Sequence, residues 1–371
     1  MGLNCKLRTL NSTLKIVFTT DKLNRGGKEK QLLILANGLL NRNYDVNIIS
    51  KNEVDYNDYY HEIGFPDERI FSLKAVKDKR LFQSFKDQIV RLDPEVILSW
   101  SVLTTLWMIR LKSLLTNKTI INCTLRQGKH YDSFKHRLLS KIAVKLSRYN
   151  ISNSKAGLDL FNLRENKNNK VIYNAFIQTR NHDNTTVSLD EVFGKKLKES
   201  DVVITNIGGL YKHKNQLSLI LSLKVLNDNR YHLMIIGEGD EREQLEKYIT
   251  EFGLIQQITL LGRKENVLPY LKAADLYVNA SSGEGCSNAI VEAMHCGLPV
   301  ISTPDGGTTE IAFPDTTQYF EFNNVHELAN RIQNAPRKQD LDKNRLNQWL
   351  QKFDLESCID HYENFIKKKA C

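Results

Sequence analysis

The sequence predicts an α/β protein built from two doubly wound, parallel sheets. Its 371 residues exceed what one hydrophobic core usually serves, so we expect two domains. Short apolar runs alternate with longer segments of helical period, which is typical of parallel strands covered by helices. The apolar fraction of 41% is ordinary for a folded globular chain, and no run approaches the roughly 18 apolar residues of a membrane span.

The first half reads as one such domain. A strand is expected at residues 14–19, followed by a loop with Gly26 and Gly27, a helix over 32–40 and a strand at 46–50. Further strands are expected at 96–100, 119–123 and 171–173, and a helix at 133–149. Because ligands bind at the carboxyl ends of parallel strands, the glycine pair after the first strand is a candidate phosphate loop.

The second half repeats the pattern. Strands are expected at 202–206, 233–236, 258–261, 276–279 and 299–302, and the chain closes with a helix over 355–369. Polar residues accumulate between 174 and 187, where we expect the domain boundary. We therefore predict domains at 1–178 and 179–352, with a C-terminal helix at 353–371.

Charge and cysteine content narrow the class of protein. Residues 1–180 carry 31 Lys and Arg against 16 Asp and Glu, whereas the remainder carries 21 against 27. The basic first half suits an anionic membrane surface or an acidic substrate, and no aromatic-rich motif accompanies it to favour nucleic acid. The six cysteines are scattered without a C-x-x-C pair, and no secretory signal is visible. A reduced, cytoplasmic protein is expected.

The most informative stretch is S-G-E-G-C-S-N-A-I-V-E at residues 282–292. It places Glu284 in a Gly-rich loop and Glu292 within a helix that begins near Ser287 and Asn288, both good N-cap residues. A helix start offers free N–H groups to a phosphate. The two carboxylates would then accept hydrogen bonds from hydroxyls on either side of a diphosphate.

Five further matches lie in order along the chain, at residues 236–240, 261–263, 273–275, 299–302 and 306–310. With the E-x7-E pair, this region resembles the donor domain of family 4 glycosyltransferases, which are retaining enzymes of the GT-B architecture. The resemblance implies two Rossmann-like domains facing each other across a cleft, with the C-terminal helix packing back on the first domain. It also implies a nucleotide-sugar co-substrate, with a UDP-sugar favoured.

The same resemblance assigns site residues. Glu284 would face the transferred sugar, with the N–H groups of residues 285–288 nearby, and Glu292 would hold the ribose. Lys214 would neutralise the leaving diphosphate. The residues expected to bind the donor without reacting are Gly26, Gly27, Gly262, Arg263, Gly285, Cys286, Ser287, Asn288 and Glu292.

The chain departs from the family pattern at one position. The arginine usually found five residues before the lysine is Gly209 here, so one of two expected cationic clamps is missing. Lys212, Arg25 and Arg126 are the candidate substitutes. No metal is expected, because the D-x-D pair at Asp340 and Asp342 lies in a polar stretch that a solvated helix face explains better.

The sequence gives fewer indications of how the acceptor binds. Arg126 and His130, which follow the strand at 119–123, are our candidate acceptor-binding residues. Within 133–149, Arg137, Lys141, Lys145 and Arg148 form a basic stripe beside apolar positions 134, 138, 142 and 146. An ordinary amphipathic helix explains this pattern, and peripheral docking on the anionic cytoplasmic face of a membrane is the alternative.

The sequence thus predicts a hexosyl- or N-acetylhexosaminyltransferase that acts on a hydroxyl acceptor, a lipid-linked or growing glycan in cell-envelope polysaccharide synthesis. Two alternatives stay open. One is another GT-B enzyme, such as a nucleotide-sugar 2-epimerase or a phosphorylase. The other is a non-catalytic scaffold, a possibility that the missing arginine at position 209 keeps open.

Overall fold

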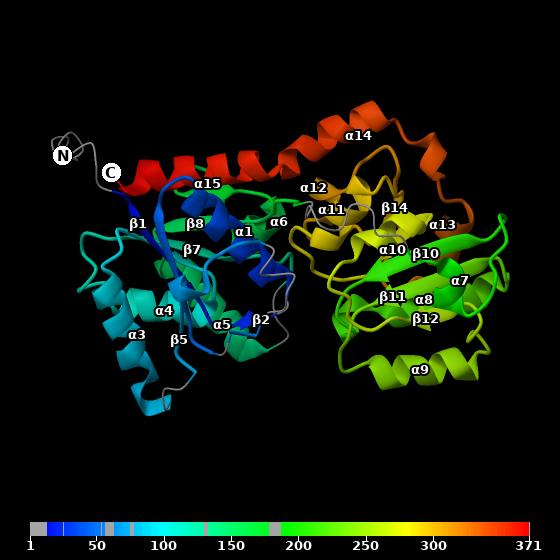
Figure 1. Ribbon diagram of the computed structural model, residues 1–371, viewed down its shortest axis with the longest axis horizontal. Helices are drawn as coiled ribbons and strands as arrows, with labels where there is room; N and C mark the ends of the chain where they lie inside the picture. The colour runs from blue at the N-terminus through cyan, green and yellow to red at the C-terminus, as the bar shows by residue number, and fades with distance from the viewer. Residues whose placement is uncertain are drawn as a thin grey trace. The chain divides into compact units, whose positions relative to one another are not determined.

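The computed structural model describes residues 13–24, 26–52, 54–55, 63–74, 78–129, 133–177 and 187–370. The chain folds into two compact units (Figure 1). The first unit comprises residues 1–126, 130–175 and 354–371, and the second comprises residues 127–129 and 176–353. Each unit contains one parallel sheet covered by helices.

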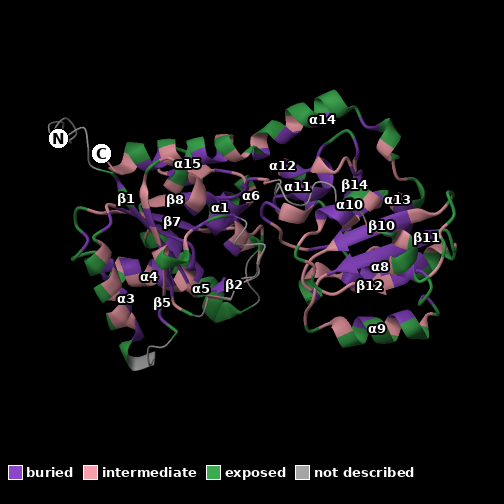
Figure 2. Ribbon diagram, viewed as in Figure 1, coloured by how far each residue is buried: buried purple, intermediate pink, exposed green. Residues whose placement is uncertain are grey.

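The sheet of the first unit has seven parallel strands in the order β5-β3-β1-β6-β7-β8-β9. Their bounds are β1 Lys15–Thr20, β3 Asp45–Ser50, β5 Ile70–Ser72, β6 Val96–Ser99, β7 Thr119–Leu125, β8 Tyr149–Ser152 and β9 Asn169–Val171. A small separate sheet pairs β2 (Leu23–Asn24) with β4 (Val54–Asp55). The central strands are buried on both faces, as parallel strands between helices require (Figure 2).

The helices of the first unit are α1 Gly27–Asn41, α3 Asp78–Leu92, α4 Val102–Arg110, α5 Phe134–Leu146, α6 Lys155–Asp159 and α15 Leu355–Ala370, with a 3-10 turn η1 at Asp67–Arg69. Ser101 caps α4 and Ser154 caps α6 through hydrogen bonds from Thr104 N and Gly157 N. Each serine lies two positions after the last residue of a strand, so each strand end and helix start are fixed together.

The second unit has six parallel strands in the order β12-β11-β10-β13-β14-β15. They are β10 Val202–Ile207, β11 Tyr231–Ile236, β12 Ile258–Leu260, β13 Leu276–Asn279, β14 Val300–Ser302 and β15 Thr317–Tyr319. The helices are α7 Leu189–Phe193, α8 Gln216–Leu226, α9 Arg242–Glu251, α10 Leu268–Ala273, α11 Asn288–His295, α12 Thr308–Ile311, α13 Val325–Gln333 and α14 Lys343–Leu350. The 3-10 turns are η3 Lys212–Lys214, η4 Lys338–Asp340 and η5 Gln351–Phe353. The predicted α/β class with two parallel sheets is confirmed.

Three strands of the two large sheets were not predicted. β8 lies inside the first sheet, yet Asn150 and Ser152 interrupt its apolar pattern because their side chains bond to neighbouring strands rather than to water. β5 and β15 lie at sheet edges and have three residues each, only partly buried. Apolar periodicity is weak in both situations.

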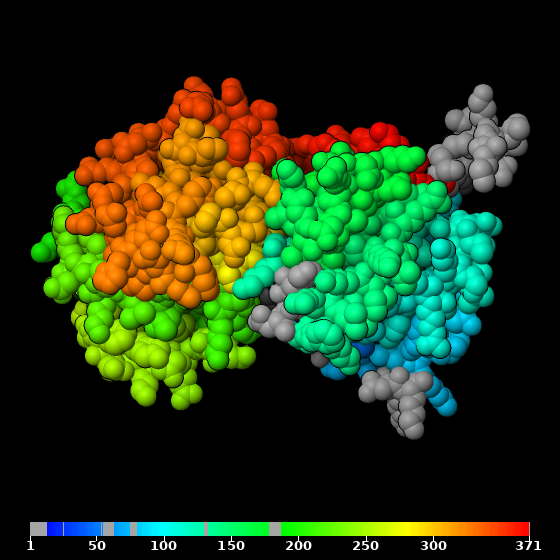
Figure 3. Space-filling model, turned by 180° about the vertical axis from the view of Figure 1, so that it is seen from behind, coloured from blue at the N-terminus to red at the C-terminus, as the bar shows by residue number. Residues whose placement is uncertain are grey.

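Helix α15, the last of the chain, packs within the first unit. It buries Cys358, Ile359, Tyr362, Phe365 and Ile366. Its red atoms lie against the green atoms of the first unit in the space-filling view (Figure 3). A long C-terminal segment therefore completes the core of the N-terminal unit.

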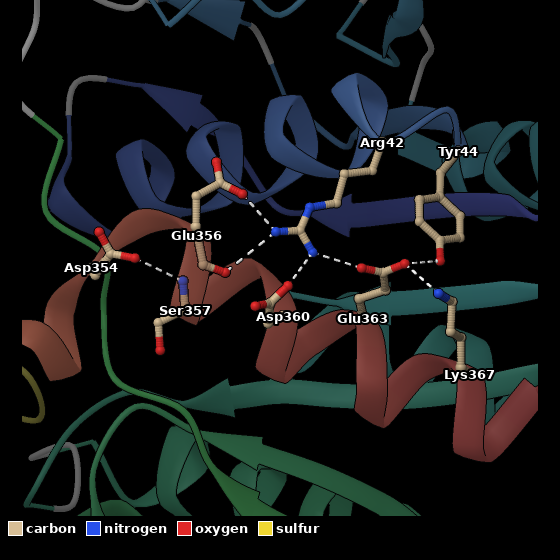
Figure 4. Close-up of polar contacts among 8 residues, drawn as sticks. All are labelled: Arg42, Tyr44, Asp354, Glu356, Ser357, Asp360, Glu363 and Lys367. Carbon is tan, nitrogen blue, oxygen red and sulfur yellow. Dashed lines mark hydrogen bonds and ion pairs between the residues drawn. The ribbon is translucent and has the colours of Figure 1, made fainter.

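A polar network ties α15 to the end of α1 (Figure 4). The Arg42 guanidinium contacts three carboxylates of α15. One of them, Glu363, also bonds to Tyr44 and Lys367. The contacts are Arg42 to Glu356 at 2.6 Å, to Asp360 at 2.5 Å and to Glu363 at 2.6 Å, with Tyr44 and Lys367 at 2.7 and 2.5 Å from Glu363. Burial alone would raise the pKa of Glu363, but hydrogen bonds from Lys367, Tyr44 and Arg42 lower it to about 2.

Candidate functional site

The second sheet has a topological switch point between β10 and β13. From β10 the chain adds β11 and β12 on one side, and then returns to add β13, β14 and β15 on the other. The loops that leave β10 and β13 therefore diverge at the carboxyl ends of these two strands. Ligands of doubly wound sheets bind at such points.

Lys214 and Glu284 meet at this switch point. Lys214 lies in η3, after β10, and Glu284 lies in the loop after β13, so 70 residues separate them. The Lys214 ammonium and a Glu284 oxygen form an ion pair in which both side chains are about four-fifths buried. Burial favours a raised pKa for Glu284, but the charge and hydrogen bond of Lys214 outweigh it and lower the pKa. The carboxylate is thus held in its charged form.

Close backbone packing fixes the position of Glu284. Its carbonyl oxygen accepts a hydrogen bond from Gly307 N at 2.7 Å, and Gln127 pairs with it in an antiparallel bridge. Gly306 has φ +61° and a Cβ there would overlap that carbonyl, as would a Cβ at Gly128. Glycine is therefore required at both positions for the loops to approach.

Glu292 lies in the second turn of α11, the helix that follows the Glu284 loop. It is 8% exposed, and Tyr277 in β13 is fully buried near both Glu284 and Glu292. Burial, followed by the charges of these two carboxylates, raises the pKa of Tyr277. The two ends of the E-x7-E motif thus share one neighbour, which the sequence did not single out.

Helix α11 begins where the sequence predicted. Ser287 occupies the N-cap position, Asn288 is the first helical residue, and the Ser287 side chain makes no capping hydrogen bond. Cys286 and Ser287 are buried in the loop that leads into the helix, together with Gly285. The first-turn N–H groups therefore carry the positive end of the helix dipole without a side-chain cap.

Gly262 and Arg263 follow β12, two strands from β10. Gly262 has φ +70°, its carbonyl accepts from Gly237 N at 2.9 Å, and a Cβ there would lie 3.0 Å from Glu238 Oε1. Arg263 is exposed. These residues lie at the same carboxyl edge of the sheet as Lys214 and Glu284, because all six strands are parallel.

Tyr211 occupies the space beside Gly209. A Cβ at Gly209 would overlap the Tyr211 ring, so the ring fills the volume that a side chain at 209 would need. The ring is 43% exposed and lies parallel to the His213 ring at 6.0 Å. An arginine at 209 would require Tyr211 to move. Lys212, one candidate substitute for that arginine, is exposed in η3.

The remaining predicted site residues, Gly26, Gly27 and Arg126, belong to the first unit. Gly26 is the N-cap of α1 and Gly27 its first residue. Arg126 bonds to Cys123 O, Asn174 Oδ1 and Tyr362 OH at 3.0–3.1 Å, with its guanidinium 3.7 Å above the Trp100 ring. These contacts join β7 to α15. His130 and Arg25 lie outside the described residues.

The predicted D-x-D residues serve as helix caps. Asp342 accepts hydrogen bonds from Asn344 N and Arg345 N at the start of α14, and Asp340 accepts one from Arg337 N. Among the residues that the structure describes, no three or more His, Cys, Asp or Glu side chains form a group that could hold a metal ion.

Residues 189–348 match the family model described as glycosyl transferases group 1. This part of the chain is a group 1 glycosyltransferase domain. It contains Lys214, Glu284, Glu292 and the loops around them. An uncharacterized glycosyltransferase of Methanocaldococcus jannaschii, MJ1059, is 29% identical over 201 residues, which cover 50% of this chain and 48% of that protein.

Another relative carries a more specific name. The UDP-Gal:alpha-D-GlcNAc-diphosphoundecaprenol alpha-1,3-galactosyltransferase of Escherichia coli is 29% identical over 142 residues, 37% of each chain. The matched stretch spans about half the length of MJ1059 and less of the Escherichia coli protein.

Solved structures show the fold of the whole chain. Anabaena Alr3699/HepE, crystallised in complex with UDP and glucose, superposes with a TM-score of 0.76 at 20% identity, covering 95% of this chain and 98% of that one. The group 1 domain and the first unit together thus have the GT-B fold, as the sequence predicted.

Proposed function

We propose that this protein is a retaining glycosyltransferase of family 4 that moves a hexosyl or N-acetylhexosaminyl group from a UDP-sugar to a hydroxyl acceptor. The observation that carries the proposal is the Lys214–Glu284 ion pair at the switch point of the group 1 domain. The pair consists of one cation and one carboxylate beside the start of α11. In this proposal the cation contacts the diphosphate, and the carboxylate contacts the sugar. Relatives whose names include UDP support the choice of nucleotide.

Each residue then has a separate task. Lys214 and the N–H groups at the start of α11 stabilise the diphosphate as the bond from the anomeric carbon to the phosphate oxygen breaks. Glu284 accepts hydrogen bonds from the transferred sugar. The acceptor oxygen attacks from the same face, and its proton passes to the leaving phosphate oxygen. This scheme requires neither an enzyme nucleophile nor a metal ion.

Glycine-rich contacts complete the donor site in this proposal. Glu292 binds the ribose hydroxyls, and Gly262 and Arg263 border the base. The exposed Tyr211 ring replaces the missing arginine as the wall of the site, so Lys214 is the principal cation.

Glu292→Ala is expected to weaken UDP binding by about tenfold to a hundredfold, because a hydrogen bond to a charged group is worth about 1.5–3 kcal/mol. Isothermal titration calorimetry with UDP, GDP, ADP and CMP measures the affinity of each nucleotide. Glu251→Ala, an exposed carboxylate on α9, is the matched control and should bind UDP like the wild type. Equal affinity in wild type and Glu292→Ala would remove Glu292 from the donor site.

This titration, together with turnover assays on the nucleotide sugar, separates the alternatives. A 2-epimerase would consume the nucleotide sugar without an acceptor and yield an epimer, and a phosphorylase would depend on inorganic phosphate. A scaffold would bind no nucleotide, or bind one without turnover. Retention is tested by the anomeric configuration of the product in proton NMR.

The acceptor in this proposal is a lipid-linked or growing glycan of the cell envelope. The name of the Escherichia coli relative includes a diphosphoundecaprenol acceptor. Among the described residues, every helix is too short or too polar to span a bilayer. We propose that such an acceptor is approached through the surface of α5.

Helix α5 exposes both stripes that the sequence contains. Its inward face, Ser140, Ala143 and Val144, is buried. The basic residues Arg137, Lys141, Lys145 and Arg148 are exposed, and so are four large apolar side chains: Phe134 74%, Leu138 48%, Ile142 37% and Leu146 54%. An apolar row flanked by basic side chains suits an anionic lipid interface better than water.

Replacing Lys141 and Lys145 by Glu is expected to lower partition onto phosphatidylglycerol-containing vesicles by at least about thirtyfold. Each basic residue near an anionic surface contributes about 1 kcal/mol, and reversal adds repulsion. Vesicle cosedimentation measures the change. A matched double variant in the second unit, Lys196→Glu with Lys198→Glu, should bind like the wild type. If the wild type binds vesicles of phosphatidylcholine alone as well as it binds phosphatidylglycerol-containing vesicles, the basic residues do not contribute to membrane binding.

A further inference from the structure

The first unit has its own topological switch point, between β1 and β6. From β1 the chain adds β3 and β5 on one side, and then returns to add β6 through β9 on the other. The loops after β1 and β6 diverge there, as those after β10 and β13 do in the second unit. The rule that assigns a ligand site to one switch point applies equally to the other.

A carboxylate and a hydroxyl meet across this point. Asp21 is the first residue after β1, and Ser101 is the N-cap residue of α4, two positions after β6. The Ser101 hydroxyl donates to Asp21 Oδ1 at 2.7 Å, although 80 residues separate them. Trp100 N also bonds to Thr19 O at 2.7 Å, which holds the two strand ends side by side.

Buried polar side chains support this pair from below. Thr104 Oγ1 lies 2.8 Å from Ser101 Oγ and 3.0 Å from Ser99 Oγ, and Ser99 also bonds to Thr19 and Thr105. All of these hydroxyl groups are buried. Such a network satisfies its own members and leaves Ser101 little rotational freedom. The orientation of the Asp21 carboxylate is therefore fixed before any ligand arrives.

The other carboxylate oxygen is available. Within the described part of the chain, Asp21 Oδ2 accepts no hydrogen bond, and Asp21 is only partly buried. Lys28, in the first turn of α1, is held at the same strand end, because its carbonyl oxygen accepts a hydrogen bond from Trp100 Nε1 at 3.2 Å. The Asp21 charge acts on the Lys28 ammonium, which makes no hydrogen bond with a described residue. Burial lowers the pKa of Lys28, while the charges of Glu29 and Asp21 oppose that shift.

A carboxylate beside an ammonium selects one class of ligand. A phosphate would be repelled by Asp21, and a single carboxylate is a poor cage for a divalent cation. Neighbouring sugar hydroxyls fit both groups, because one hydroxyl donates to Asp21 while the next accepts from Lys28.

We propose that Asp21 and Lys28 form a sugar-hydroxyl site that binds the acceptor at the switch point of the first unit, with Ser101 as its positioning residue. The inference rests on the proposed glycosyl transfer, whose acceptor it locates. It adds a carboxylate and an ammonium to the acceptor candidates Arg126 and His130.

The test compares Asp21→Asn with wild type. The amide keeps an oxygen for the Ser101 hydroxyl but removes the charge, so the fold should hold. Saturation-transfer NMR with octyl glycosides of glucose, galactose and N-acetylglucosamine measures binding without any donor. We expect at least one glycoside to bind wild type, and Asp21→Asn to bind it about tenfold or more weakly. Asp159→Asn, an exposed carboxylate of α6, is the matched control.

Kinetics separate this site from the donor site. With that glycoside and a UDP-sugar, Asp21→Asn should raise the acceptor KM about tenfold or more, while UDP affinity and slow hydrolysis of the UDP-sugar by water stay unchanged. Absence of UDP binding in wild type would reject the glycosyl transfer proposal, yet the NMR arm would still decide the sugar site. Unchanged glycoside binding in Asp21→Asn, or no binding of any glycoside by wild type, would overturn the site.

Discussion

Replacing Glu284 by Gln is expected to lower kcat by about a thousandfold, which is the upper range for loss of one preorganised electrostatic contact. Glutamine is nearly isosteric, so the loop held by Gly306 and Gly307 should stay in place. The amide cannot carry the charge that Lys214 holds in the carboxylate form. UDP lacks the transferred sugar, so its affinity should stay close to the wild-type value.

Two further variants make this result specific. Lys214→Met should lower both UDP affinity and kcat, because the ammonium is expected to contact the diphosphate before and during the reaction. Glu251→Gln on α9 should change neither. Stopped assays of UDP release, with calorimetric UDP binding on the same preparations, measure both quantities. If Glu284→Gln keeps the wild-type kcat, Glu284 has only a structural role as the partner of Lys214.

The regular part of the fold follows from the sequence because of how parallel sheets bury their strands. Long strands such as β10 and β11 are covered on both faces, and each contains a short apolar run, at residues 202–204 and 233–236. β8 was missed for the opposite reason. Asn150 satisfies its amide through Asn122 and Asn169 on adjacent strands, and such pairing leaves no trace in a single sequence.

The candidate site divides in the same way. Lys214 and Glu284 could be assigned individually because short motifs surround each of them. Their direct contact, and the burial of Tyr277 near both carboxylates, depend on strand order, which the sequence alone does not give. The Tyr211 ring beside Gly209 is likewise visible only in three dimensions.

Asp21 and Ser101 escaped sequence analysis although each carried a signal. Asp21 follows a strand directly, and Ser101 stands between a strand and a helix, where capping alone explains it. Only the register that brings β1 beside β6 turns two ordinary residues into a pair. The exposed apolar row of α5 is similar, because periodicity predicts a stripe but not which side faces water.

Deleting residues 355–371 is expected to unfold the first unit while leaving UDP binding by the second unit intact. The deletion removes Ile359, Tyr362, Phe365 and Ile366 from the core, at about 1.5–3 kcal/mol each. Their sum is comparable to the whole stability of a domain, about 5–15 kcal/mol. Arg42 and Arg126 would also lose their α15 partners.

The two units provide the contrast that makes this deletion informative. Residues 176–353 enclose their own hydrophobic cluster, which includes Leu233, Leu276 and Phe320, so UDP titration should report an intact second unit. Loss of the near-ultraviolet circular dichroism of the first-unit tryptophans, Trp100 and Trp107, should accompany it. Glu356→Gln is the control, since that carboxylate is 71% exposed and Arg42 keeps two other partners. A truncated chain that unfolds in one transition at the wild-type temperature would show that α15 only covers the first unit. In that case Arg42 and its carboxylates, although close together, would stabilise the helix and not the domain beneath it.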